Sequence, residues 1–244
     1  MCSASCRLVR LLGTILRDHV WTEIRYDPLI DLCNLNSSHS LLIRLVEPGT
    51  NVLDMGCANG YPGRILINQR GCTVSGIEID PAAAEAAGQT YHDVIVGDVE
   101  ENGIFSRLQY KPFDVIIFGD VLEHLRRPEI VLVTARSILK LDGYVLISLP
   151  NVVTLRLRLC FLLGHFDYTE QGIMDQTHLR FLTLRTAHEL IQTCGYYIEH
   201  FDFVIGPNFW RYLQWWHIPK RWLPPSIFGT QFVFKVCPEE RSQN

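Results

Sequence analysis

The sequence lacks an excess of positive charge. Its 22 lysines and arginines are outnumbered by 26 acidic residues, which gives a formal net charge of -4 at pH 7. Proteins that bind nucleic acid gain much of their affinity from lysines and arginines that neutralise phosphates. We therefore expect no nucleic-acid partner for this chain.

The sequence also lacks a long hydrophobic segment. Nowhere do 18 apolar residues follow one another, which is the length that a membrane-spanning helix needs. The mostly apolar run from Leu11 to Leu16 follows Arg7 and Arg10, but it is too short for the core of a signal peptide. We expect a cytoplasmic protein without a transmembrane helix.

Cysteines are present, but the patterns that would give them a role are missing. The eight cysteines include no CxxC pair and no Cys/His cluster at zinc-binding spacing. We interpret them as reduced thiols. No metal site is predicted, because the acidic residues that can be placed are assigned below to a cofactor or to helix caps.

What the sequence does contain is a regular alternation of strand and helix patterns. Several strands are continuous apolar runs, as expected for a sheet that helices cover on both faces. Loops that follow parallel strands gather at one edge of the sheet, where ligands bind. The pattern predicts an α/β fold with a doubly wound, mostly parallel sheet. The predicted strands are Asn51–Asp54, Thr73–Ile79, Asp93–Val96, Phe113–Phe118, Tyr144–Leu149, Tyr197–Phe203 and Thr230–Val236, and the helices are 62–69, 81–88, 100–108, 127–140 and Leu184–Thr193.

The length of 244 residues fits one large domain that carries insertions. We predict an N-terminal helical segment over 1–48 and a cofactor-binding core over 49–204, with an insertion at 151–183 that covers the substrate. A Trp/Pro-rich insertion over 205–229 and a last strand with its tail over 230–244 complete the predicted organisation.

The first predicted strand runs into a glycine-containing turn, and two cofactors compete for this motif. A nicotinamide site prefers the spacing GxGxxG, which lets backbone amides reach a pyrophosphate. Gly56 and Gly60 have the spacing GxxxG instead, and Asp54 stands at the end of the strand. A carboxylate there repels a pyrophosphate but attracts the ammonium and sulfonium groups of S-adenosylmethionine. The motif therefore favours S-adenosylmethionine.

Acidic residues also end the second and third predicted strands. Glu78 is placed to accept hydrogen bonds from ribose hydroxyls, whereas Asp80 and Pro81 predict a helix N-cap. Asp98 can accept the exocyclic amine of adenine while Val99 covers a ring face. The alternative for Gly-Asp is a plain turn, but three acids in an ordered series favour the cofactor.

These motifs together resemble those of the class I S-adenosylmethionine-dependent methyltransferases. The likeness rests on VLDMGCANG (52–60), GIEIDP (76–81), GDVE (97–100), FDVIIFGDVLEHL (113–125) and GYVLISLPN (143–151). The resemblance implies a seven-stranded Rossmann-like sheet with a reversed last strand. Ala58 stands where the family often has a third glycine, and we expect this single methyl to be tolerated. The cofactor pocket predicted with the resemblance comprises Asp54, Gly56, Cys57, Gly60, Glu78, Ile79, Asp98, Val99 and Asp120.

Two histidines are candidate catalytic residues, because a hydroxyl acceptor must lose a proton as it is methylated. His124 follows the fourth predicted strand. The alternative is that Asp120 and Glu123 form a capping box and that His124 only belongs to the start of a helix. His178 lies in DQTHLR (175–180) of the insertion, where the alternative is a loop whose polar side chains satisfy its own backbone.

Two narrower resemblances concern the second half of the chain. The segment YTEQGIMDQTHLRFLT (168–183) resembles bacterial methyltransferases found with surface-polysaccharide and glycan genes, and SLPNVVTLRLRLCFLLG (148–164) resembles MetW-type proteins. We predict a methyltransferase that O-methylates a small molecule, such as a sugar or a lipid-linked glycan. N-methylation of a small molecule and a non-catalytic role as a partner protein are the alternatives.

The segment 208–228 interleaves tryptophans with basic residues. Three interpretations remain open for such a mixture: a cap over the substrate pocket, a peripheral contact with a membrane, or a second small core.

Overall fold

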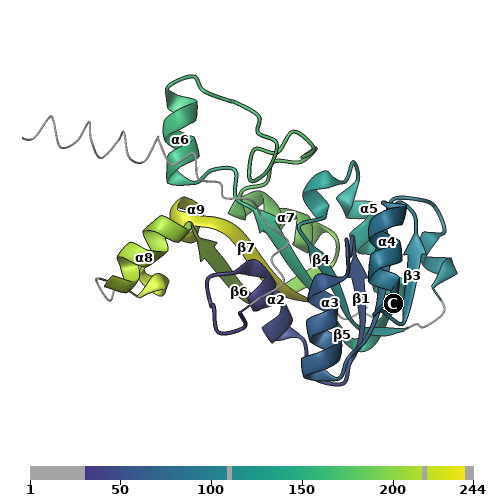
Figure 1. The fold of residues 1–244 in the computed structure, drawn as a ribbon. Helices are drawn as coiled ribbons and strands as arrows, with labels where there is room; N and C mark the ends of the chain where they lie inside the picture. The colour runs from purple at the N-terminus through teal and green to yellow at the C-terminus, as the bar shows by residue number, and fades with distance from the viewer. Residues whose placement is uncertain (1–30, 109–111, 216–218, 240–244) are drawn as a thin grey trace, which may run out of the picture.

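The centre of the molecule is a seven-stranded sheet (Figure 1). The computed structural model describes residues 31–108, 112–215 and 219–239. The strand order is β3-β2-β1-β4-β5-β7-β6, with parallel pairs from β3 to β5 and β7 antiparallel to both of its neighbours. The predicted α/β fold with a reversed last strand is confirmed. The strands are β1 (Asn51–Met55), β2 (Thr73–Glu78), β3 (Asp93–Val96), β4 (Phe113–Gly119), β5 (Leu139–Pro150), β6 (Tyr196–Ile205) and β7 (Gly229–Pro238).

Helices cover both faces of this sheet, so the apolar strands are buried on two sides. Along β1, Val52 belongs to one hydrophobic cluster and the next residue, Leu53, belongs to another. This alternation follows from the two-residue period of a strand. The Val52 cluster includes residues of α2 (Ser38–Leu45), α3 (Tyr61–Arg70) and α4 (Pro81–Gly88), and the Leu53 cluster includes residues of α5 (Pro128–Ala135) and α7 (Leu184–Thr193).

Local sequence signals explain where two of these helices begin. The Asp80 side chain accepts hydrogen bonds from the backbone N–H groups of Ala82 and Ala83 at 2.8 and 3.4 Å, and Pro81 takes the first helical position of α4. The predicted N-cap is therefore confirmed. Thr183 caps α7 through a reciprocal pair of bonds that satisfies amides at the helix start.

The predicted helix over 100–108 is wrong. Only a short 3₁₀ turn, η1 (Ile104–Arg107), forms in this segment. Gly103, which precedes the turn, has a positive φ of 82° and interrupts any longer helix.

The predicted helix over 127–140 is too long at its C-terminal end. The α-helix α5 ends at Ala135, and the 3₁₀ turn η3 (Arg136–Ile138) follows it. Leu139 already belongs to β5, because it pairs with Phe113 of β4. This pairing between distant segments is invisible in the local pattern.

The predicted substrate-covering insertion contains α6 (Leu155–Leu162) and a long loop (Figure 1). A small separate core of Val152, Leu157, Ile173 and Met174 holds it together. The loop is fixed to the sheet edge by Glu123, whose carbonyl oxygen accepts hydrogen bonds from the N–H groups of residues 179 and 180 at 2.8 and 2.9 Å. The insertion is thus anchored beside the carboxyl end of β4.

The Trp/Pro-rich segment forms α8 (Pro207–Trp215), η4 (Lys220–Trp222) and α9 (Pro225–Phe228). Trp210 packs against the main core, whereas Trp215 and Trp222 are 77% and 69% exposed. Packing thus accounts for only part of this segment, and contact with a membrane stays a prediction.

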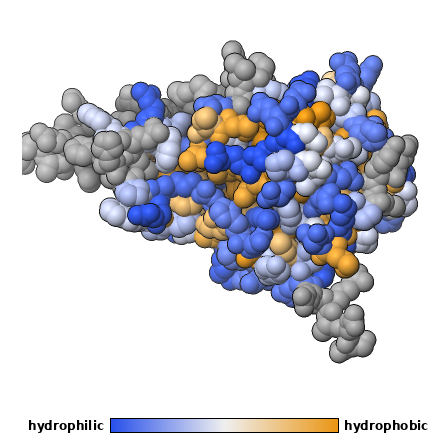
Figure 2. Space-filling view, turned by 90° about the horizontal axis from the view of Figure 1, so that it is seen from below, coloured by the Kyte–Doolittle hydropathy of each residue, from blue (hydrophilic) through white to orange (hydrophobic). Residues whose placement is uncertain are grey.

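Hydrophobic residues also reach the surface elsewhere. The face in Figure 2 is mostly hydrophilic, but hydrophobic residues gather in patches on it. No helix among the described residues is long and apolar enough to cross a bilayer. Most of the predicted N-terminal helical segment lies outside the described residues, and α2 is its described part.

Candidate active site

A cavity of about 690 Å³ opens at the carboxyl ends of β1 and β4. Its walls come from four parts of the chain that are distant in sequence: the residues around the start of α2, the loop after β1, the turn after β4 and the insertion. Pro150 at the end of β5 and Gln231 of β7 complete it. Ligands of doubly wound sheets bind at this edge, so the cavity is the candidate active site.

Asp54 lies at the end of β1 and is 6% exposed. One of its carboxylate oxygens accepts a hydrogen bond of 2.6 Å from the Tyr91 hydroxyl, which itself accepts one from the N–H of Gly63 at 3.1 Å. Burial raises the pKa of Asp54 to about 6; the Tyr91 hydrogen bond opposes this shift, and the nearby Glu78 adds to it. A buried carboxyl with this pKa responds strongly to any cation placed beside it.

The loop after β1 turns sharply through residues with positive φ. Gly56 has a φ of 64°, and a Cβ atom there would lie 2.8 Å from a methyl group of Val121. Gly60 has a φ of 74°, and a Cβ atom there would lie 2.9 Å from the α-carbon of Ala87. Both glycines are therefore required by the fold itself, before any cofactor is considered.

Ala58 differs from the sequence-based expectation in one respect. Its φ is 45°, in the left-handed region that alanine rarely adopts. From the sequence, the only expected effect of alanine in place of glycine was one added methyl group. In the structure, the unfavourable feature is the left-handed backbone conformation of this alanine.

Glu78 and Asp98 lie on neighbouring strand ends. The Glu78 carboxylate accepts hydrogen bonds from the N–H of Ala58 at 2.8 Å and from the N–H of Asp80 at 2.9 Å. It therefore ties the ends of β1 and β2 together. The N–H of Gly97 donates to the Glu78 carbonyl oxygen at 2.9 Å, which brings the end of β3 alongside.

Asp98 is exposed and accepts a hydrogen bond of 2.8 Å from the N–H of Glu100. A turn of this kind was the alternative interpretation of the Gly-Asp pair. The Asp98 carboxylate can still accept hydrogen bonds from further donors. Ile79 is 65% exposed beside Glu78, and Val99 packs partly against the core. An exposed isoleucine at a strand end offers an apolar surface to a ligand.

The predicted cofactor residues thus fall into two groups. Four of them line the cavity: Asp54, Gly56, Cys57 and Asp120. The other five lie in the β1 loop or at the ends of β2 and β3: Gly60, Glu78, Ile79, Asp98 and Val99. Burial, followed by the charges of Asp54 and Glu78, raises the pKa of the Cys57 thiol, so this cysteine stays protonated.

Asp120 follows β4 with a φ of 57°. Its backbone N–H donates to the Ser148 hydroxyl at 3.0 Å, and that hydroxyl donates to the Asp120 carboxylate at 2.6 Å. The Gln231 side chain donates to the same carboxylate oxygen. Strained backbone held by several polar contacts often marks a functional position.

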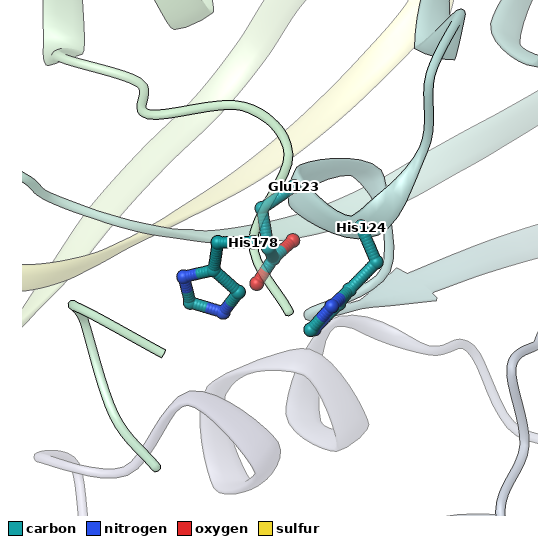
Figure 3. A group of neighbouring side chains, drawn as sticks. All are labelled: Glu123, His124 and His178. Atoms are coloured by element: carbon teal, nitrogen blue, oxygen red, sulfur yellow. The ribbon is translucent and has the colours of Figure 1, made fainter. Parts of the chain in front are cut away.

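Three side chains with ligand atoms meet beside Asp120: Glu123, His124 and His178 (Figure 3). Glu123 and His124 belong to the 3₁₀ turn η2 (Leu122–His124), whereas His178 comes from the insertion. One ligand atom of each residue lies within 4.8 Å of the other two. The histidine rings are 4.7 Å apart between centroids and meet edge to face.

The capping-box alternative for Asp120 and Glu123 is wrong. The N-cap of η2 is Val121, and no side chain makes a capping hydrogen bond there. Glu123 is instead buried, at 1% exposure, and its Oε2 atom has no hydrogen-bond partner among the described residues. Burial, followed by the charge of Asp120, raises the pKa of this carboxyl well above its usual range.

Hydrogen bonds set the tautomer of both histidines. The Nδ1 atom of His178 lies 3.1 Å from the carbonyl oxygen of Ile173, and Nδ1 of His124 lies 3.3 Å from that of Thr177. Carbonyl oxygens only accept, and the Thr177 hydroxyl, 3.2 Å from Nδ1 of His124, already donates its proton to Asp175, so each Nδ1 carries the proton and each Nε2 keeps its lone pair. The alternative for His178 was a loop residue whose side chain satisfies the backbone of its own loop. The hydrogen bond of Nδ1 fits that alternative, but it does not account for Nε2.

The cavity is strongly acidic. Asp31, Asp54, Asp120, Glu123 and Asp175 line it, and no lysine or arginine does so among the described residues. Arg180, which is close to His178 in sequence, donates a hydrogen bond to the carbonyl oxygen of Arg126. Such a cavity attracts cations and repels phosphates.

Several of these features were not predicted from the sequence. Tyr91 and Gln231 give no signal, because a single polar residue beside a strand has many roles. The residues around the start of α2 also line the cavity, and Asn36 fixes them by two hydrogen bonds to the backbone of Ile205, at 2.7 and 2.8 Å. Glu123 gave a signal, its spacing from Asp120, but the signal was assigned to a cap.

Comparison with known proteins identifies the class. A crystal structure of an S-adenosylmethionine-dependent methyltransferase from Archaeoglobus fulgidus is similar, with a TM-score of 0.56 and 18% identity, over 82% of this chain and 94% of that one. A family model described as a methyltransferase domain matches residues 19–200. The chain belongs to this methyltransferase domain family, so the class recognised from the sequence is confirmed.

Two curated proteins are also similar to this chain. The sterol methyltransferase-like 1 protein of Botryococcus braunii is 22% identical over 89% of this chain and 55% of its own length. A ubiquinone biosynthesis O-methyltransferase of Actinobacillus pleuropneumoniae is 26% identical over 60% of this chain and 64% of its own length. The matches thus span less than two thirds of either relative. The glycan-associated and MetW-like resemblances stay predictions.

Proposed function

We propose that this protein is an S-adenosylmethionine-dependent methyltransferase that methylates a hydroxyl group of a small molecule. The observation that carries the proposal is the pairing of two features in one cavity. A buried carboxylate, Asp54, lines one wall, and two histidines with free Nε2 lone pairs, His124 and His178, line another. The first feature suits a cationic cofactor, and the second suits an acceptor that must lose a proton.

S-adenosylmethionine fits the cavity by charge and by size. The molecule carries an ammonium and a sulfonium group, and the cavity is lined by five acidic residues. A volume of about 690 Å³ lies in the range of ligand sites. When bound, this cofactor supplies a methyl group on an already activated leaving group.

The chain's own residues then have distinct roles in the proposal. Asp54 pairs with a positive group of the cofactor, Glu78 accepts from the ribose and Asp98 accepts from adenine, with Ile79 and Val99 against the ring. Gly56 and Gly60 shape the loop, and Cys57 and Asp120 complete the walls.

The acceptor side of the cavity positions the hydroxyl and promotes loss of its proton. Methyl transfer is an in-line displacement, so the protein must hold the acceptor oxygen in line and exclude water. The cluster of Glu123, His124 and His178 lies at the cavity wall and is the group we assign to the hydroxyl.

The acidic lining restricts the class of acceptor. A phosphate or carboxylate near the cluster would meet Asp120, Glu123 and Asp175, so the methylated end of the acceptor is uncharged. A sugar hydroxyl satisfies this condition, as does the hydroxyl of a lipid-linked glycan whose phosphate stays outside. The ubiquinone biosynthesis relative is named as an O-methyltransferase, which supports oxygen as the acceptor atom.

The same acidity favours one other candidate, a cationic amine acceptor. An amine must lose its proton before it attacks, and the acidic residues that line the cavity hold that proton more tightly. N-methylation is therefore the second candidate.

The test begins with calorimetric titration of S-adenosylmethionine, S-adenosylhomocysteine and NAD. We expect binding of the two adenosyl ligands and none of NAD. Labelled S-adenosylmethionine is then offered with pairs of acceptors that differ only in a hydroxyl or an amine at one position, sugars first. Label on the hydroxyl member supports the proposal; label on the amine member alone overturns it, and absence of adenosyl binding points to a non-catalytic partner protein.

A further inference from the structure

We propose that Glu123, His124 and His178 bind one divalent transition-metal ion of the Zn²⁺ type, which activates the acceptor hydroxyl. Metal binding itself does not depend on the proposed function, whereas the role of the ion in hydroxyl activation rests on it. The three side chains lie close together in Figure 3, and one ligand atom of each lies within 4.8 Å of the other two.

The first argument is the donor set. Two imidazoles and one carboxylate are a ligand combination of catalytic zinc sites, in which a fourth position stays open. Imidazole nitrogen suits zinc, copper, iron or nickel, whereas magnesium, calcium and manganese prefer oxygen ligands. The site opens into the cavity, where an acceptor oxygen can take the open position.

The second argument is the orphaned carboxylate. Glu123 is 1% exposed, yet its Oε2 atom has no hydrogen-bond partner among the described residues. A buried polar atom without a partner costs free energy unless a ligand completes it. Neither lysine nor arginine lines this cavity in the described part of the chain, so no side-chain ammonium or guanidinium there pairs with this carboxyl group.

The third argument is that both imidazoles are already oriented as ligands. The backbone carbonyls of Ile173 and Thr177 hold Nδ1 of His178 and of His124, which leaves both Nε2 lone pairs free. Metal-binding histidines usually have their second nitrogen fixed by such a carbonyl. Asp175 strengthens this support, because it accepts hydrogen bonds from the backbone N–H and the hydroxyl of Thr177 at 2.8 and 2.7 Å.

The geometry needs only a small adjustment. Ligands of a tetrahedral zinc ion with bonds of roughly 2.0–2.1 Å lie about 3.3 Å apart. The three ligand atoms lie within 4.8 Å of one another without an ion. Side-chain rotation of the two histidines and the glutamate can close this difference, while the backbone bonds from the insertion to Glu123 keep the loop in place.

An ion at this position lowers the pKa of a hydroxyl that binds to it. The acceptor oxygen then forms the bond to the methyl carbon, the carbon–sulfur bond breaks with its electron pair going to sulfur, and the hydroxyl proton leaves to solvent water. No redox change of the metal takes part, so Zn²⁺ suffices.

The test measures metal binding directly. The full-length protein is treated with a chelator, dialysed and titrated with Co²⁺, whose visible absorbance reports nitrogen and oxygen ligands, and bound Co²⁺ is then displaced by Zn²⁺. We expect one saturable site that millimolar Mg²⁺ does not displace. Glu123→Gln and His178→Ala should each weaken binding by on the order of tenfold or more.

Matched controls come from the same insertion. His165 and Glu170 are exposed and lie outside the cluster, so His165→Gln and Glu170→Gln should leave Co²⁺ affinity unchanged. Absence of a saturable site overturns the proposal, as does binding that neither cluster variant weakens, or a site that Mg²⁺ occupies equally well.

Titration of the chelated protein with S-adenosylmethionine separates this inference from the proposed function. If the cofactor binds normally while Co²⁺ does not bind, the metal site is wrong and the methyltransferase proposal stands. If Co²⁺ binds and the cofactor does not, the metal site stands and the methyltransferase proposal is wrong. If both bind, methyl transfer should be lost after chelation and return with Zn²⁺ or Co²⁺; activity that survives complete metal removal overturns the role of the ion.

Discussion

The two walls of the cavity are assembled in different ways. On the cofactor side, each proposed contact lies at or just beyond the end of a strand: Asp54 near the end of β1, Glu78 at the end of β2 and Asp98 after β3. On the acceptor side, the contacts come from η2, the insertion, β7 and the segment before α2. The first wall is encoded by short local motifs, whereas the second exists only after distant segments have packed together.

Substitutions on the two sides of the cavity should have different effects. A residue on the cofactor side is held by its own strand and by backbone amides, as Glu78 is. His178 is held by a loop, and that loop depends on two hydrogen bonds to the Glu123 carbonyl. We therefore expect substitutions on the two sides to separate cleanly into effects on cofactor affinity and effects on turnover.

The largest expected effect is on the acceptor side. His178→Ala should lower kcat by roughly 10²–10⁴-fold, because it removes a group that activates the acceptor. The affinity for S-adenosylmethionine, measured by calorimetry, should stay unchanged. His165→Ala is the matched control, since His165 lies in the same insertion and is exposed; wild-type turnover in the His178 variant would remove this residue from the mechanism.

The next effect is on the cofactor side. Glu78→Gln should weaken S-adenosylmethionine binding by roughly 10- to 100-fold, because hydrogen bonds to a charged group contribute about 1.5–3 kcal/mol. Asp98→Ala should have a smaller effect, because Asp98 is exposed. Glu85→Gln, on the exposed side of α4, is the control. Unchanged affinity in both variants would contradict the assigned pocket.

A third prediction concerns pH. The pKa of Asp54 is raised to about 6 in the free protein, and a bound cation favours the ionised carboxylate and lowers that pKa. The complex then binds fewer protons than the free protein, so affinity is full above about pH 7 and falls by about tenfold at pH 5. Calorimetric titrations between these values measure the effect.

Two variants test the origin of this pH dependence. Tyr91→Phe removes the hydrogen bond that lowers the Asp54 pKa, so the midpoint should move to higher pH. Asp54→Asn should give a flat profile with weaker binding. A midpoint that is the same in all three proteins would assign the titration to another group.

The smallest effect concerns stability. Ala58 has a left-handed backbone, which costs a non-glycine residue roughly 1–2 kcal/mol, and glycine loses part of that gain through its entropy in the unfolded state. Ala58→Gly should raise the free energy of unfolding by about 0.5–1 kcal/mol in urea denaturation. Ala86→Gly, within α4, should lower it by a similar amount.

Sequence patterns predicted the strands and turns that carry the proposed cofactor residues, because strand ends and turns are local. The strands β1, β2 and β3, the N-cap at Asp80 and the acidic series all follow from residues that are neighbours in the chain. The helix over 100–108 and the end of the helix over 127–140 were predicted wrongly, because Gly103 and the pairing of Leu139 with Phe113 overrode local preference.

The sequence by itself therefore determined the fold class, the order of the strands along the chain and the candidate cofactor residues, since each depends on a short repeating pattern. Only the tertiary structure decided that Glu123 is buried without a partner beside two histidines, and that the cavity they share holds no lysine or arginine among its described residues. Burial and the convergence of distant segments depend on how the whole chain packs, and a spacing such as that between Asp120 and Glu123 is equally compatible with a helix cap.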